Sequence, residues 1–155
     1  MTTLRRNKIV SAILLILTLL WTSFIFSMSL KTASESSEIS GGLLKSILLF
    51  IKDILWFEID FSVLHNLFRK LAHFTEFFIL GILSVGFIKS IKTSLTYPLL
   101  YCLCVAAIDE TLQYFTGAGR SAQLSDVLLD FSGSLTAVII FCLIGFIINK
   151  IRIKN

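Results

Sequence analysis

Long runs of apolar residues dominate this sequence and limit what the chain can fold into. A transmembrane helix needs about 20 mostly apolar residues to cross about 30 Å of hydrocarbon. Four stretches approach that length, at residues 9–28, 71–88, 98–115 and 127–148. Only 15% of the residues are charged, against about 25% in a soluble domain, whose surface must be hydrated. The sequence therefore predicts an all-α membrane protein, a single domain over residues 1–155 built as a bundle of four transmembrane helices, and it excludes a soluble enzyme.

The distribution of charge predicts the orientation of these four spans. Eight of the 14 Lys and Arg residues lie before the first span, between the second and third, or after the fourth. They are Arg5, Arg6, Lys8, Lys89, Lys92, Lys150, Arg152 and Lys154. All ten Asp and Glu residues fall in the other segments. Because cytoplasmic segments are enriched in Lys and Arg, we expect a multi-pass plasma-membrane protein with the N-terminus and the C-terminus in the cytoplasm.

The first apolar run follows a basic start and in that respect resembles a signal peptide. It is about twice as long as the usual apolar core of a signal peptide. No clear cleavage site of small residues follows it. We therefore expect this segment to be retained as a membrane anchor.

Residues 43–57, in the long first extracellular loop, are apolar but too few to form a comfortable span. Their polar members recur at a spacing of seven and so share one edge of a helix. They are Lys45, Ser46, Lys52 and Asp53. This amphipathic pattern predicts a helix that lies in the outer interface, or a re-entrant segment in the same place.

Ionisable and amide side chains occur near one end of three of the spans. They are His73 and Glu76 in the second span, Asp109, Glu110 and Gln113 in the third, and Asp126 and Asp130 at the start of the fourth. In the predicted topology all of them lie within about 10 Å of the outer boundary, at 1.5 Å per residue. Such side chains are costly in hydrocarbon and usually face the interior of a bundle. We therefore expect one polar pocket that is open to the outside.

Small residues in the fourth span predict where a neighbouring helix comes close. Gly133 and Ala137 lie four residues apart and therefore share one face of the helix. Small residues at that spacing allow two transmembrane helices to approach closely.

Three kinds of chemistry suit the predicted pocket. An anionic head group would be held by cations and by the N-termini of the second and fourth spans, and these cations are Lys70 and Arg120. A hard divalent cation, the one cofactor that we consider, takes oxygen ligands, and the candidates are Glu76, Asp109, Glu110, Asp126 and Asp130. An acid–base pair needs a proton carrier and a partner, and the candidates for catalysis are His73, Glu76 and Glu110. The structural alternative is a buried ion-pair network, for instance of Asp109 with Arg120, that only fixes helix packing.

Three blocks of the sequence resemble the VanZ-like family of integral membrane proteins. The blocks are Arg-Lys-Leu-Ala-His-Phe-Thr-Glu-Phe at 69–77, Asp-Glu-Thr-Leu-Gln-Tyr-Phe at 109–115, and Gly119-Arg120 followed by Asp-Val-Leu-Leu-Asp-Phe-Ser-Gly at 126–133. A weaker similarity covers the end of the first span at 24–29, and the whole resemblance runs from about residue 20 to residue 140. The chain departs from the family pattern at Leu112, where the family often has His.

The resemblance implies an envelope role in a bacterium. The family is named for a protein that raises resistance to teicoplanin, a lipoglycopeptide that binds cell-wall precursors. Its recurring polar positions correspond to the residues that we expect to bind a ligand. They are Lys70, His73, Glu76, Asp109, Glu110, Gln113, Arg120, Asp126 and Asp130.

We therefore expect the pocket to bind an anionic amphiphile, either a membrane lipid, a lipid-linked cell-wall precursor or a lipoglycopeptide. Such binding would contribute to teicoplanin resistance. The alternatives are a membrane-embedded hydrolase or transferase that acts on a lipid head group, with or without a metal, and a non-catalytic structural or partner-binding module. The net charge is +4, but no basic patch is interleaved with aromatic residues, so no nucleic-acid partner is expected. The sequence gives no indication of an oligomeric state.

Overall fold

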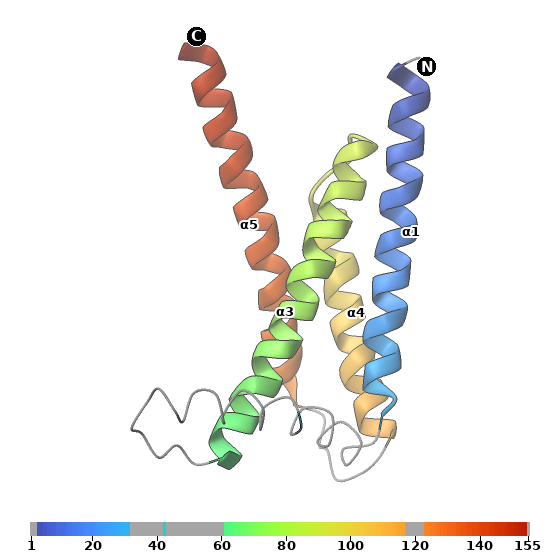
Figure 1. Ribbon diagram of the computed structural model, residues 1–155, viewed down its shortest axis with the longest axis vertical. Coiled ribbons are helices and arrows are strands. Elements are labelled where there is room, and N and C mark those ends of the chain that lie inside the picture. The colour runs from blue at the N-terminus through green and yellow to red at the C-terminus, as the bar shows by residue number, and fades with distance from the viewer. Residues whose placement is uncertain (1–2, 32–41, 43–60, 117–122, 155) are drawn as a thin grey trace.

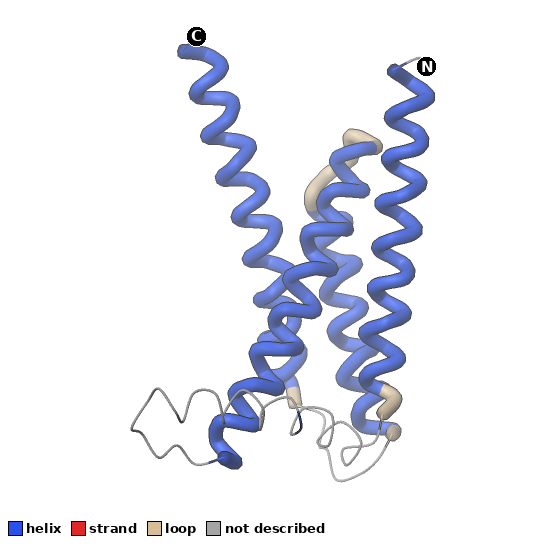
Figure 2. The backbone as a smooth tube through the Cα atoms, in the orientation of Figure 1, coloured by secondary structure: helices blue, strands red, loops and turns tan. Residues whose placement is uncertain are grey.

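The computed structural model describes residues 3–31, 42, 61–116 and 123–154. Within these ranges the chain forms helices and no strand, as Figure 2 shows. The helices are α1 (Thr3–Ser29), α3 (Phe61–Ser90), α4 (Thr96–Phe115) and α5 (Leu124–Lys154). The prediction of an all-helical protein is confirmed for the described residues. The helix predicted at 43–57 lies outside them.

Three of the helices are long and apolar enough to cross a membrane. The candidate spans are Asn7–Ser29 in α1, Ser62–Ser90 in α3 and Leu124–Ile153 in α5. The helix α4 is not among them. Its 20 residues would extend about 30 Å, but Asp109, Glu110 and Gln113 make its C-terminal half polar. The membrane crossing by α4 therefore stays a prediction.

The helix α3 begins at Phe61, well before residue 71, where the hydropathy pattern starts the second span. The physical reason is that residues 61–70 contain no Pro or Gly that would end a helix. Lys70 therefore lies inside α3, not at its first residue. The helix α5 likewise continues beyond the predicted residue 148, to Lys154.

The four helices form one bundle (Figure 1). The start of α1 and the end of α5 lie at the same end of the molecule, and the C-terminal half of α5 diverges from the other helices. The apolar core lies where α1, α3 and α4 meet. Its buried members are Ile25, Phe77, Leu80, Cys102, Val105 and Ala106. The polar end of α4 and the starts of α3 and α5 gather at the end away from the termini.

Small residues bring α3 and α5 into close contact, as Gly133 and Ala137 predict. A Cβ atom added at Gly133 would lie 2.3 Å from the carbonyl oxygen of Phe74 on α3. A Cβ atom added at Gly81 would lie 2.8 Å from the Cβ of Ala137. Backbones at this separation leave no room for larger side chains, which is the packing expected of transmembrane helices with small interface residues.

Two hydrogen bonds from side chains to backbone carbonyls hold α3 in this position. The Ser134 hydroxyl on α5 donates to the carbonyl oxygen of Phe77 at 2.9 Å. The Trp21 indole N–H on α1 donates to the carbonyl oxygen of Glu76, also at 2.9 Å. The helix α3 is thus bonded on both sides, next to the residues that carry its ionisable groups.

Replacement of Gly133 by Ala should lower the stability of the fold. The new methyl group would meet the Phe74 backbone, which cannot move aside as a flexible side chain can, and overpacking typically costs about 1–3 kcal/mol. The matched control is Gly145→Ala, since nothing lies within 4 Å of the added Cβ there. Thermal unfolding of both variants in detergent should show a lower midpoint for Gly133→Ala only, and equal midpoints would contradict this account.

Candidate functional site

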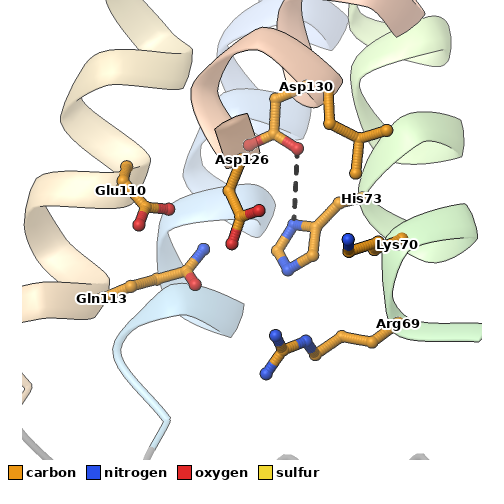
Figure 3. Close-up of a pocket in the computed structure, with 8 residues that line it drawn as sticks. Arg69, Lys70, His73, Glu110, Gln113, Asp126 and Asp130 are labelled. Atoms are coloured by element: carbon orange, nitrogen blue, oxygen red, sulfur yellow. Dashed lines mark ion pairs between the residues drawn. The ribbon is translucent and has the colours of Figure 1, made fainter. Parts of the chain in front are cut away.

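A small pocket lies between α3, α4 and α5, and polar side chains from all three helices face it (Figure 3). The cavity has a volume of about 10 Å³, which is room for about one water molecule. It is lined by Arg69, Lys70, His73, Glu110, Gln113, Asp126, Leu129 and Asp130. Arg69, Lys70 and His73 come from α3 and lie opposite the carboxylates of α4 and α5. A basic side therefore faces an acidic side.

The structure brings together most of the residues that the sequence proposes for the site. Lys70, His73, Glu110, Gln113, Asp126 and Asp130 line the pocket. Glu76 and Asp109 lie next to this wall. Glu76 reaches within 3.7 Å of His73, and a carboxylate oxygen of Asp109 lies within 4.8 Å of donor atoms on both His73 and Asp130. Arg120 lies outside the described residues.

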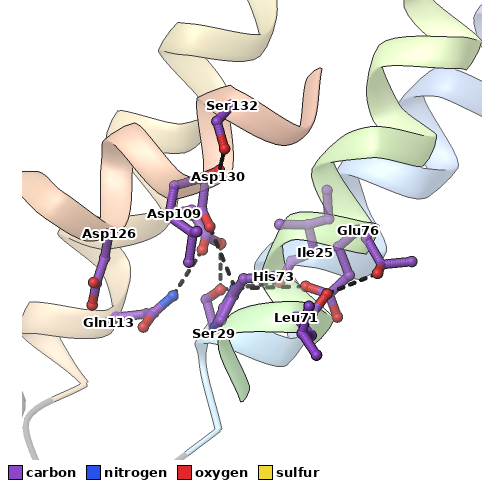
Figure 4. Close-up of polar contacts among 12 residues, drawn as sticks. Ile25, Ser29, Leu71, His73, Glu76, Asp109, Gln113, Asp126, Asp130 and Ser132 are labelled. Carbon is purple, nitrogen blue, oxygen red and sulfur yellow. Dashed lines mark hydrogen bonds and ion pairs between the residues drawn. The ribbon is translucent and has the colours of Figure 1, made fainter. Parts of the chain in front are cut away.

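The imidazole of His73 lies between carboxylates from two helices. Its Nδ1 is 3.7 Å from Oε2 of Glu76, three residues further along α3, and 4.0 Å from Oδ1 of Asp130 on α5 (Figure 4). The His73 side chain is 23% exposed, whereas that of Asp130 is 3% exposed. A protonated imidazole here would be paired with either carboxylate, and a neutral one could accept a proton or a metal ion.

Asp109 is the most buried acid of the site, at 0% exposure. Its Oδ2 accepts a hydrogen bond of 2.8 Å from Nε2 of Gln113, one helical turn further along α4. Its Oδ1 accepts a hydrogen bond from the hydroxyl of Ser29, at the end of α1. Both oxygens of Asp109 therefore accept hydrogen bonds. One of the two donors, Ser29, is on α1, the described helix that does not line the pocket.

Glu110 has a structural partner. Its Oε1 accepts a hydrogen bond of 2.8 Å from the backbone N–H of Gln123, the residue just before α5. Asp126 lies in the first turn of α5, where a negative charge interacts favourably with the helix dipole. The start of α5 is thus already supplied with carboxylates from its own turn and from α4.

The expectation that two helix N-termini point at the pocket is wrong for α3. That helix starts at Phe61, about 18 Å before His73 at 1.5 Å per residue. Among the described helices, α5 alone has its N-terminus at the pocket. The cationic side chains at the pocket are those of Arg69 and Lys70, and they are not joined there by a pair of helix N-termini.

Comparison with protein families identifies the chain. The model of the VanZ/LLP1 family matches residues 14–145, a range that includes every residue lining the pocket. The chain belongs to the VanZ/LLP1 family. The resemblance of the three sequence blocks to VanZ-like proteins is thereby confirmed. No curated protein and no solved structure shows significant similarity to the chain.

In this VanZ/LLP1 protein two residues that donate hydrogen bonds to acids of the site could not be predicted from the sequence. Ser29 is 80 positions from Asp109, to which it donates, and Gln123 is 13 positions from Glu110. A serine at the end of an apolar helix and a glutamine in a loop carry no signal of their own. The only pointer to Ser29 is that it ends the block at 24–29 that resembles the family.

Replacement of Ser29 by Ala should destabilise this VanZ/LLP1 protein. It removes one donor to the buried carboxylate of Asp109, and a buried acceptor that loses its donor costs about 1–3 kcal/mol. The control is Ser27→Ala, because the Ser27 hydroxyl is exposed and donates only to the carbonyl of Phe24 in its own helix. Thermal unfolding in detergent should separate the two variants. A Ser29→Ala midpoint equal to that of wild type would show that this bond does not hold α1 to the site.

Proposed function

We propose that this VanZ/LLP1 member is a multi-pass plasma-membrane protein whose pocket faces the cell exterior and binds the head group of an anionic amphiphile in the outer leaflet. The proposed orientation is supported by the ends of the bundle. The start of α1 and the end of α5 lie at the same end of the bundle (Figure 1), and the segments around them are basic and free of acids. The pocket is at the other end, where the positive-inside rule puts the outside.

The observation that carries the proposed function is the pairing of opposite charges across one pocket. Arg69 and Lys70 lie on one side, and Glu110, Asp126 and Asp130 on the other. A phosphate or carboxylate suits the basic side, where charge-assisted hydrogen bonds are the strongest kind available. Hydroxyl, amide or amine groups of the same head group suit the acidic side, which accepts hydrogen bonds. A head group that carries both kinds matches both sides.

The size of the pocket sets how such a ligand binds. A cavity of about 10 Å³ has no room for a whole head group. The head group would therefore lie at the mouth, held by the exposed Lys70 and the partly exposed Arg69, with one polar group reaching inward. Suitable amphiphiles of the cell envelope are anionic membrane lipids, lipid-linked cell-wall precursors and lipoglycopeptides. Binding of the last two would give the protein a part in teicoplanin resistance.

The orientation can be tested by cysteine labelling in intact cells, after replacement of Cys102, Cys104 and Cys142. A membrane-impermeant maleimide should label Gln123→Cys, because that exposed position lies at the pocket end, and should not label Lys150→Cys until the cells are opened. Labelling of Lys150→Cys from the outside, with Gln123→Cys protected, would reverse the orientation and put the pocket in the cytoplasmic leaflet.

The head-group proposal can be tested with the matched pair Lys70→Ala and Lys89→Ala. Both positions are exposed on α3, Lys70 at the pocket and Lys89 in the last turn of the helix, and both changes remove one positive charge. In nanodiscs, Lys70→Ala should weaken binding of a lipid-linked precursor diphosphate by about tenfold or more, since a hydrogen bond to a charged group contributes about 1.5–3 kcal/mol. Lys89→Ala should bind as wild type does.

Two further measurements make this test specific. Teicoplanin is titrated in parallel, so that a drug ligand is separated from a precursor ligand. A neutral diacylglycerol serves as the non-binding amphiphile. Equal losses in both lysine variants would mean that only the net charge of the protein matters, and the head-group proposal would then be wrong.

One observation favours a catalytic alternative. His73 lies within 4.0 Å of two carboxylates and could carry a proton in the hydrolysis or transfer of a lipid head group. In that case His73→Gln would keep head-group binding but abolish turnover of a phosphate-bearing lipid. Retention of full teicoplanin resistance by His73→Gln would leave binding as the function.

A second observation favours a purely structural role for Glu110. Its carboxylate accepts a hydrogen bond from the backbone N–H of Gln123. In that case Glu110→Ala would lower the amount of protein in the membrane.

A further inference from the structure

Below the basic mouth of the pocket, three helices bring a nitrogen donor and two oxygen donors to one place. Donor atoms of His73 on α3, Asp109 on α4 and Asp130 on α5 all lie within 4.8 Å of one another. Nδ1 of His73 and Oδ1 of Asp130 are 4.0 Å apart. We propose that His73, Asp109 and Asp130 form a binding site for one divalent transition-metal ion of the zinc class.

The donor atoms lie somewhat farther apart than a bound ion would hold them. A tetrahedral ion with bonds of about 2.1 Å to each donor holds the donors roughly 3.4 Å from one another. Side-chain rotations that move the donor atoms by less than an ångström would bring Nδ1 of His73 and Oδ1 of Asp130 to that spacing. Oε2 of Glu76 lies 3.7 Å from the same imidazole nitrogen, so that a further oxygen is at hand.

Burial and charge favour an ion over an empty cluster. Asp109 is 0% exposed and Asp130 is 2% exposed, unlike acidic clusters on a wet surface. Two carboxylates this close repel each other strongly in a medium of low dielectric constant. One imidazolium supplies a single positive charge, whereas a divalent ion supplies two. Neutralisation by a bound ion would therefore stabilise both carboxylates at once.

The surroundings of the donors are those of a metal site. Gln113 and Ser29 donate hydrogen bonds to the two oxygens of Asp109 (Figure 4), and partners of this kind orient metal ligands in proteins. His73 and Asp130 also form part of the pocket wall, where there is room for about one water molecule. Three protein ligands and one water is the arrangement typical of catalytic zinc.

The donor set also decides the class of ion. The sequence alone suggests a hard cation bound by carboxylates, Glu110 and Asp126 among them. Glu110 is instead bonded to the backbone of Gln123, and the group of mutually close donors contains an imidazole. Calcium takes six to eight oxygen ligands, whereas imidazole suits zinc and its neighbours among the transition metals. Zinc is therefore the ion to test first.

The test measures the metal directly. Tag-free protein in detergent is equilibrated with Zn²⁺ and desalted, and its zinc content is measured by inductively coupled plasma mass spectrometry. Wild type should retain one zinc ion per chain, and His73→Ala and Asp130→Asn should lose it under the same conditions. The matched controls should retain it. They are His65→Ala, the other histidine of α3, and Asp126→Asn, a carboxylate of the same pocket outside the donor set.

A second readout separates loss of the ion from loss of the fold. Chelation should lower the thermal midpoint of wild type and leave that of His73→Ala unchanged; the His73 side chain is 23% exposed and belongs to no core. Substitution with Co²⁺ should give visible absorption bands in wild type that His73→Ala lacks. Wild type that retains no zinc, or His73→Ala that retains it in full, would overturn the proposal.

The metal site and the head-group proposal can fail separately. Zinc content is measured without any lipid, and the comparison of Lys70→Ala with Lys89→Ala is repeated on protein freed of metal. A zinc-free wild type that still binds the diphosphate through Lys70 would leave the head-group proposal intact. A zinc-loaded protein that shows no difference between the two lysine variants would leave the metal site intact.

Discussion

The close contact between α3 and α5 is the constraint on which the rest of the structure depends. Gly133 lies against the backbone at Phe74, the residue that follows His73, and Asp130 lies three residues before Gly133 on α5. The same contact therefore brings His73 and Asp130 to 4.0 Å. Apolar helices gain little from association within lipid, where tails are as apolar as Leu. The fit of small residues and the hydrogen bond from Ser134 to Phe77 must therefore hold this distance.

The bundle buries ionisable side chains at positions where neighbouring helices supply hydrogen-bond donors. A buried charge is costly unless it is paired or hydrogen-bonded. Asp109 offsets part of that cost with hydrogen bonds from Gln113 and from Ser29. The helix α1 contributes no residue to the pocket wall. Through Ser29 it nevertheless orients a carboxylate that lies next to the pocket. The indole of Trp21 on α1 makes a second connection, to the backbone of Glu76.

Much of the fold could be predicted from the sequence, because hydropathy alone locates long apolar helices. The gathering of polar residues from three helices also followed from the sequence, since each lies near the same end of its span. The contacts within the site could not be predicted. Whether Glu110 meets His73 or the backbone of Gln123 depends on how far each helix is rotated about its axis. The close contacts at Gly81 and Gly133 define this rotation for α3 and α5, but the sequence pattern does not define it for α4, which carries Glu110. Hydropathy places the start of α3 too late, because residues 61–70 are less apolar but contain no Pro or Gly that would end the helix.

The order of residues along α3 links the two proposals for the pocket. Lys70 and His73 are three residues apart, and Arg69 and His73 are four apart, so that all three share one face of the helix. One turn, about 5.4 Å, separates the basic pair from the imidazole. An anion held by Arg69 and Lys70 would therefore lie directly above the donors contributed by His73 and Asp130. A phosphate there could bridge the basic mouth and an ion bound below it, which would account for a single helix face that is basic at one turn and lies within 4.0 Å of two acids at the next.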